Sequence, residues 1–151
     1  MCIIDRDKTS RAEFEGAVAL YDVYLSKFSN EPKAYELQFY VGEIDFFRLE
    51  RNLDAATHYL AAAKGIPKDA TPEMAAMRHD ALYNALVALS REMDVKRDKK
   101  GETEADKKYA DALDLYAQFY PNDPQLPAMF YRQGQYYFAN ANYDSAVKRC
   151  V

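Results

Sequence analysis

Apolar residues recur every three to four positions along almost the whole chain, and this spacing constrains the fold more than any other feature. A period near 3.6 residues is typical of an α-helix that buries one face. Short groups of Pro, Gly, Asn and Ser interrupt the pattern and predict helix ends, because proline and glycine disfavour helix continuation. The 151 residues include 23 alanines but only 15 residues of Val, Ile and Thr, a balance that favours helices over strands. The sequence therefore predicts an all-α protein.

The interruptions divide the chain into seven expected helices. Their approximate bounds are residues 10–28, 33–49, 52–64, 72–93, 109–120, 126–139 and 142–151. Thr71 and Pro72 suit the N-cap and first helical position of the fourth helix, and Gly65 suits the position after the third. Residues 94–108 carry mixed charges around a glycine and are expected to form an extended connection. We expect residues 1–9 to be an N-terminal extension and residues 10–151 to be a single domain.

One register of small and large residues recurs among these helices. Ala112 is followed after four residues by Tyr116, and Ala146 with Cys150 repeats this step 146 − 112 = 34 residues later. Steps of four, three and nine residues join two further sets, which are Tyr40, Ile44, Phe47 and Ala56, and Phe130, Gly134, Tyr137 and Ala146. The small residue lets two helices approach closely, and the large residue fills the gap beside it. A single hairpin cannot bury both of its faces, so units of this kind are stable when stacked.

With this register and period, the chain resembles tetratricopeptide-repeat (TPR) proteins. The best match is residues 127–151, which read PAMFYRQGQYYFANANYDSAVKRCV, although the family's usual Trp is absent and Ile44 stands in place of a Gly. The resemblance implies a right-handed α-solenoid of antiparallel helix hairpins with about seven helices. The irregular repeats are similar to those of bacterial cell-envelope TPR proteins of the outer-membrane assembly, Tol-Pal-associated or gliding-machinery type. This likeness favours a periplasmic or envelope location over a cytoplasmic one.

The sequence contains no motif that indicates catalysis or a cofactor. His58 and His79 lie on different expected helices, and a metal site would need at least three converging ligands. The five glycines form no phosphate-binding loop. The basic residues within 96–108 alternate with acidic ones, whereas phosphate binding needs a stripe of one sign. We therefore expect no enzymatic activity, cofactor, metal ion or nucleic acid.

The TPR-like register implies a concave groove lined by the first helix of each hairpin. The candidate groove residues are Gln38, Val41, Asp45, Arg48, Tyr131, Gln135 and Phe138. Aromatic and polar side chains on such a surface suit the binding of a protein or peptide segment, although Tyr131 and Phe138 could equally pack on the next repeat. The expected function is a non-enzymatic scaffold for protein–protein interaction. The alternative is a cytoplasmic helical-repeat module that acts in regulation or self-assembly.

The two ends of the chain give a further expectation. The first expected helix has no partner helix before it, and the last stops about nine residues after it begins. Solenoids cover their terminal repeats with polar caps, because an uncovered repeat leaves its apolar stacking surface in water. We therefore expect the chain to belong to a longer protein or to self-associate through its terminal repeats. No apolar stretch reaches the length that a transmembrane helix needs, so a direct membrane span is not expected.

Overall fold

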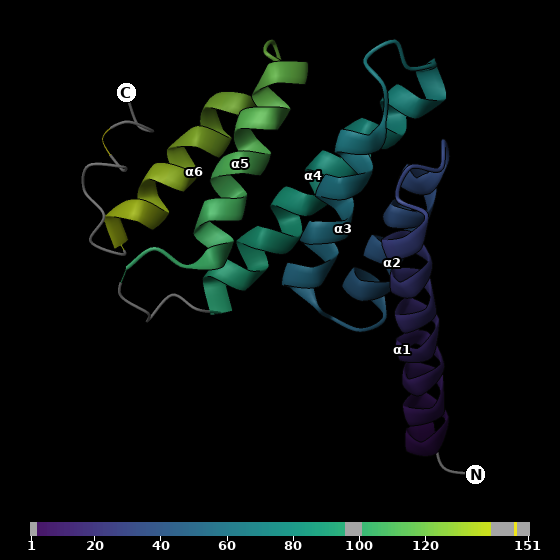
Figure 1. Cartoon of the computed structure of the whole chain (residues 1–151). Coiled ribbons are helices and arrows are strands. Elements are labelled where there is room, and N and C mark those ends of the chain that lie inside the picture. Colours follow the sequence, from purple (N-terminus) through teal and green to yellow (C-terminus); the bar gives the residue numbers. More distant parts are fainter. Residues whose placement is uncertain (1–2, 96–100, 140–146, 148–151) are drawn as a thin grey trace. The chain divides into compact units, whose positions relative to one another are not determined.

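In the computed structural model, the described part of the chain is built entirely from α-helices and the turns between them (Figure 1). The structure describes residues 3–95, 101–139 and 147, with side chains from Ser10 onward. The helices are α1 (Ile3–Lys27), α2 (Ala34–Phe47), α3 (Asn52–Gly65), α4 (Pro72–Val95), α5 (Glu104–Phe119) and α6 (Leu126–Ala139). The predicted all-α class is therefore confirmed. None of these helices combines the length and the hydropathy that crossing a membrane requires.

Several helix ends lie where local residue chemistry predicts them. α4 begins at Pro72, and the hydroxyl of Thr71 accepts a hydrogen bond from the backbone N–H of Met74 at 3.3 Å. α6 spans the predicted residues Leu126–Ala139. The seventh expected helix, with Ala146 and Cys150, lies outside the described residues except for Val147.

Two helices begin earlier than predicted. α1 begins at Ile3 rather than near Ser10. α5 begins at Glu104 and α4 extends to Val95, so the predicted extended connection over 94–108 is wrong for its first two and its last five residues. Thr103 is the N-cap of α5, because its hydroxyl accepts from the Asp106 N–H at 3.2 Å while the Asp106 carboxylate accepts from the Thr103 N–H at 2.7 Å. This reciprocal capping box satisfies two backbone donors at the helix start.

The predicted role of Gly65, as the residue that follows the third helix, also needs correction. Gly65 is the last residue of α3 and not the left-handed residue after it, and Gly101 is the one glycine of the described residues with a positive φ, at 91°. A Cβ atom at position 65 would approach Cβ of Tyr35 to 3.1 Å. Close packing between α2 and α3, rather than a left-handed turn, therefore accounts for the glycine.

The chain forms two compact units, residues 1–81 and 82–151, and each is described by itself. In the first unit, α1 and α3 both pack against α2. α3 runs antiparallel to α2, because Gly42 lies against the ring of Tyr59 and Gly65 lies against Tyr35. One core cluster of this unit contains Val18, Leu25, Val41 and Leu49.

In the second unit, α5 and α6 pack together and bury one face each. The buried residues of α5 include Tyr109, Ala112, Leu113 and Tyr116, and those of α6 are Gln133, Gly134 and Tyr137. The hydroxyl of Tyr116 on α5 donates a hydrogen bond to the carboxylate of Asp123, which lies in the connection between α5 and α6. Ala112, like Ala56 of the first unit, has no exposed surface, as expected for the small residue of the register.

Candidate functional site

The second unit contains a groove with a volume of about 520 Å³. Residues of α4 and α6 form its sides, and the buried Tyr109 of α5 contributes to its lining. The lining residues are Tyr83, Leu86, Val87, Ser90, Arg91, Asp94, Tyr109, Gln125, Ala128, Met129 and Arg132. This volume lies within the range of ligand pockets, which combine an apolar surface with a few fixed polar groups.

Hydrogen bonds hold several polar groups of this groove in place. The Tyr136 hydroxyl donates to Asp94 Oδ1 at 3.0 Å, and burial together with this bond raises the pKa of Tyr136 to about 12. Burial also raises the pKa of Tyr109, while a hydrogen bond with Ser90 and the positive charge of Arg132 lower it. Both phenols therefore stay protonated at neutral pH. The groove presents neutral hydroxyls, one acidic side chain and two arginines beside the apolar surface of Leu86, Val87 and Met129.

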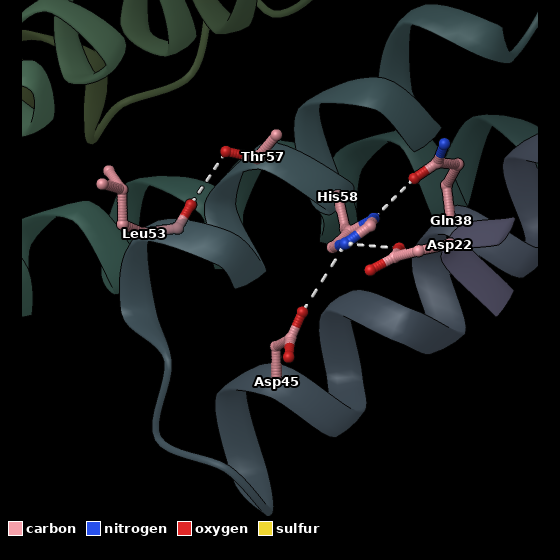
Figure 2. A network of polar contacts seen from close by, with 6 residues as sticks. All are labelled: Asp22, Gln38, Asp45, Leu53, Thr57 and His58. Atoms are coloured by element: carbon pink, nitrogen blue, oxygen red, sulfur yellow. Dashed lines mark hydrogen bonds and ion pairs between the residues drawn. The ribbon is translucent and has the colours of Figure 1, made fainter. Parts of the chain in front are cut away.

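A second arrangement of polar side chains lies in the first unit and joins three helices (Figure 2). His58 of α3 is at its centre. Its Nδ1 atom is 2.7 Å from Gln38 Oε1 of α2, and its Nε2 atom is 3.3 Å from Asp22 Oδ1 of α1 and 3.7 Å from Asp45 Oδ2 of α2. One imidazole ring thus contacts polar groups of both α1 and α2.

Asp45 is the buried acid of this cluster. Its side chain is 1% exposed, and neither of its carboxylate oxygens has a hydrogen-bond partner. The pKa of Asp45 is raised to about 6, mainly by burial, with the charges of Asp54 and Asp22 also raising it and that of Arg51 lowering it. Burial lowers the pKa of His58, and the carboxylates of Asp22 and Asp54 oppose this shift.

No group of three or more His, Cys, Asp or Glu side chains in the described part of the chain is placed to hold a metal ion. No protein-family model matches this chain, and the searches of curated proteins and of solved structures also give no match.

The candidate groove residues of α2 are distributed differently from the prediction. Val41 and Asp45 are 0% and 1% exposed, so neither lines an open surface. Tyr40 and Phe47, which the repeat register assigns to the packed face, are 56% and 61% exposed. The prediction of the inner and outer faces of α2 is therefore wrong, because α1 and α3 both pack against α2 and core packing buries Val41. Gln38 and Asp45 do come together, but at His58 of α3.

The other candidate groove residues are exposed. Arg48 lies just after α2, with its guanidinium carbon 5.5 Å from the centre of the Phe14 ring. Tyr131, Gln135 and Phe138 lie on α6, and none of the three lines the groove of the second unit. Gln125, Ala128, Met129 and Arg132 line it instead.

Sequence reasoning missed both His58 and the groove-lining side of α6. The three-residue spacing of Met129 and Arg132 places them on one face of α6, just after Gln125, and is a usable signal. It does not by itself tell which side of α6 borders a groove. For His58, no local pattern indicates that three helices meet at its ring.

Proposed function

We propose that the chain is a non-enzymatic helical-repeat scaffold that binds a segment of a protein partner in the groove of its second unit. We further propose that its helices are consecutive hairpins of a TPR-like α-solenoid, which agrees with the close α2–α3 and α5–α6 packing and with the buried Ala56 and Ala112. The groove between α4 and α6 is the observation that carries the functional proposal.

The composition of the groove suits a peptide better than a small polar metabolite. Leu86, Val87 and Met129 provide an apolar surface for one or two partner side chains. Ser90, Tyr109 and Gln125 provide hydroxyl and amide groups that can bind the polar backbone of a peptide. Binding sites of this kind combine an apolar centre with a hydrogen-bonding rim.

A selected peptide provides the test. A random library of displayed 12-residue peptides is selected against the intact chain, and a recovered peptide is labelled for fluorescence anisotropy. The double substitution Val87→Ala with Met129→Ala removes apolar groove surface, and we expect it to weaken binding about ten-fold or more, as for truncation of a central contact. The matched double substitution Tyr131→Ala with Gln135→Ala changes α6 outside the groove lining, and binding should change less than about two-fold by the same reasoning.

The two variants distinguish two possible binding surfaces, which are the groove and the side of α6 outside the groove. If Tyr131→Ala with Gln135→Ala abolishes binding while the groove variant binds normally, the partner surface is the one that the TPR-like register predicts and our groove proposal is wrong. Circular dichroism of both variants checks that helix content is unchanged, because lost helicity would also weaken binding.

A second candidate function, self-assembly, is favoured by one surface of the first unit. Leu20, Val23 and Tyr24 of α1 are exposed apolar side chains within five residues of one another, and the Tyr24 ring lies 4.8 Å from that of Phe28. Contiguous exposed apolar surface of this kind often marks an interface. Sedimentation velocity of the wild type and of Leu20→Glu tests this: a concentration-dependent dimer that the substitution dissociates supports self-assembly, and a monomer at all concentrations refutes it.

A further inference from the structure

The polar cluster of Asp22, Asp45 and His58 has an unusual proton requirement. Both ring nitrogens of His58 face oxygen acceptors, Gln38 Oε1 on one side and the two carboxylates on the other. A neutral imidazole carries one N–H, so it can donate on only one side. If Nδ1 donates to Gln38, the bare lone pair of Nε2 faces carboxylate oxygens. One further proton, held on Nε2 or on a carboxylate, converts this repulsion into a hydrogen bond.

Asp45 is the group that gains most from that proton. Its carboxylate is buried between helices, and both oxygens have no hydrogen-bond donor. An ionised carboxylate in such a place costs free energy because it loses its hydration without compensation. When protonated, Asp45 can donate from Oδ2 toward Nε2, which requires the present 3.7 Å separation to shorten by about 0.5 Å to reach hydrogen-bond distance. The proton then links α2 to α3.

We propose that Asp22, Asp45 and His58 form a proton-dependent clasp that holds α1 on the α2–α3 hairpin more tightly at mildly acidic pH than at neutral pH. α1 takes part through Asp22, whose carboxylate faces the same Nε2 atom. When Asp45 holds the proton, its carboxyl group carries no charge that repels Asp22. When the proton is lost, Asp22 faces an ionised Asp45 and the bare lone pair of Nε2, and α1 is held less tightly.

The direction of the effect follows from all the titratable groups around the cluster. These are Asp22 on α1, Asp45 on α2, His58 and Asp54 on α3, and Arg51 just before α3. Burial raises the pKa of Asp45 from 3.8 to about 6, so its stabilising contribution is present below pH 3.8 and is lost as pH rises through about 6.

His58 acts in the opposite sense. Burial lowers its pKa from 6.5, so its contribution is present above pH 6.5 and is lost as pH falls through the lowered value. The pKa of Asp45 is displaced further from its ordinary value than the pKa of His58 is. The net effect therefore follows Asp45, with His58 reducing its size.

Hydrogen exchange of the full chain tests the clasp. Amide exchange rates in residues 16–27 of α1 are measured at about pH 5 and about pH 7.5 and are corrected for intrinsic exchange, with residues 104–119 of α5 as the internal reference. A single linked proton changes an opening equilibrium by at most about ten-fold per pH unit. We expect the opening of α1 to increase several-fold toward pH 7.5, with no matching change in α5.

Substitutions separate the opposite effects of Asp45 and His58 on the pH dependence of α1 opening. His58→Gln removes the opposing titration, so the pH dependence of α1 opening should become steeper in the same direction. Asp45→Asn leaves His58 as the titrating group of the cluster, so the pH dependence of α1 opening should reverse, with more opening at about pH 5. The control is Asp69→Asn, which removes an exposed carboxyl of the same unit and should reproduce the wild-type profile.

The clasp is refuted if Asp45→Asn retains the wild-type direction, or if the wild-type α1 shows no pH dependence that α5 lacks. Should Asp45→Asn fail to fold, the wild-type protein still decides the matter by nuclear magnetic resonance. The Asp45 carboxyl carbon should titrate with a midpoint near 6, and Asp22→Asn, which removes an exposed neighbouring charge, should lower that midpoint. An Asp45 midpoint near 4 overturns the proposal.

Discussion

Replacing Gly42 of α2 by alanine tests the close packing of the α2–α3 hairpin. A Cβ atom at this position would lie 2.9 Å from Cδ1, 3.0 Å from Cε1 and 3.2 Å from Cγ of Tyr59. Carbon atoms in favourable contact are about 3.5–4.0 Å apart, so the ring must move by several tenths of an ångström. The ring has little freedom to do so, because Tyr59 has no exposed surface and its hydroxyl donates to Glu43 at 2.6 Å.

The size of the effect follows from two opposing contributions. Overpacking a tight core contact costs about 1–3 kcal/mol. Alanine in place of glycine within a helix gains about 1 kcal/mol. We therefore expect Gly42→Ala to range from nearly neutral to about 2 kcal/mol less stable than the wild type.

Gly16 in the middle of α1 provides the matched control, because nothing lies within 4 Å of a Cβ atom built there. Gly16→Ala should gain about 1 kcal/mol without a packing cost. Urea unfolding followed by circular dichroism gives the two midpoints. A Gly42→Ala protein that is stabilised as much as Gly16→Ala would show that α2 and α3 do not approach closely at Tyr59, and the hairpin packing described here would be wrong.

Two further substitutions test local features of the fold. Thr103→Ala removes the hydroxyl of the capping box at the start of α5 and should lower the free energy of unfolding, read from the urea midpoint, by about 1 kcal/mol. The control Thr57→Ala should cost less, because Thr57 is exposed and its hydroxyl bonds within its own helix. Ala56→Leu places a larger side chain at a position with no exposed surface and should cost about 1–3 kcal/mol, so an unchanged thermal unfolding curve would contradict the role of Ala56 as the small residue of the register.

The helix ends that the sequence predicted correctly are those with strong local chemistry. Thr71 and Pro72 form a cap and a first helical residue wherever the rest of the chain lies, and the start of α4 follows. The start of α5 was equally readable, because Thr103 and Asp106 have the spacing of a capping box. The many charges between residues 94 and 108 concealed that signal.

The buried face of α2 could not be predicted in the same way. The helix reads AYELQFYVGEIDFF, which is apolar around most of its circumference, so periodicity does not single out one side. Burial of Val41 and Asp45 rather than Tyr40 and Phe47 depends on which sides α1 and α3 cover, and this is a tertiary property. The contacts of His58 are beyond local patterns for the same reason, since Asp22, Gln38 and Asp45 come from two other helices.

Site-specific photo-crosslinking to a selected peptide is the most direct test of the central claim that the groove between α4 and α6 binds a partner segment. A photo-reactive amino acid replaces Val87 in the groove, Tyr131 on α6 outside it, or Val23 on α1, each in an otherwise unchanged chain. Our account predicts strong crosslinking from position 87 that unlabelled peptide suppresses, and weak crosslinking from positions 131 and 23. Competed crosslinking from position 131 or 23 with none from position 87 would contradict it.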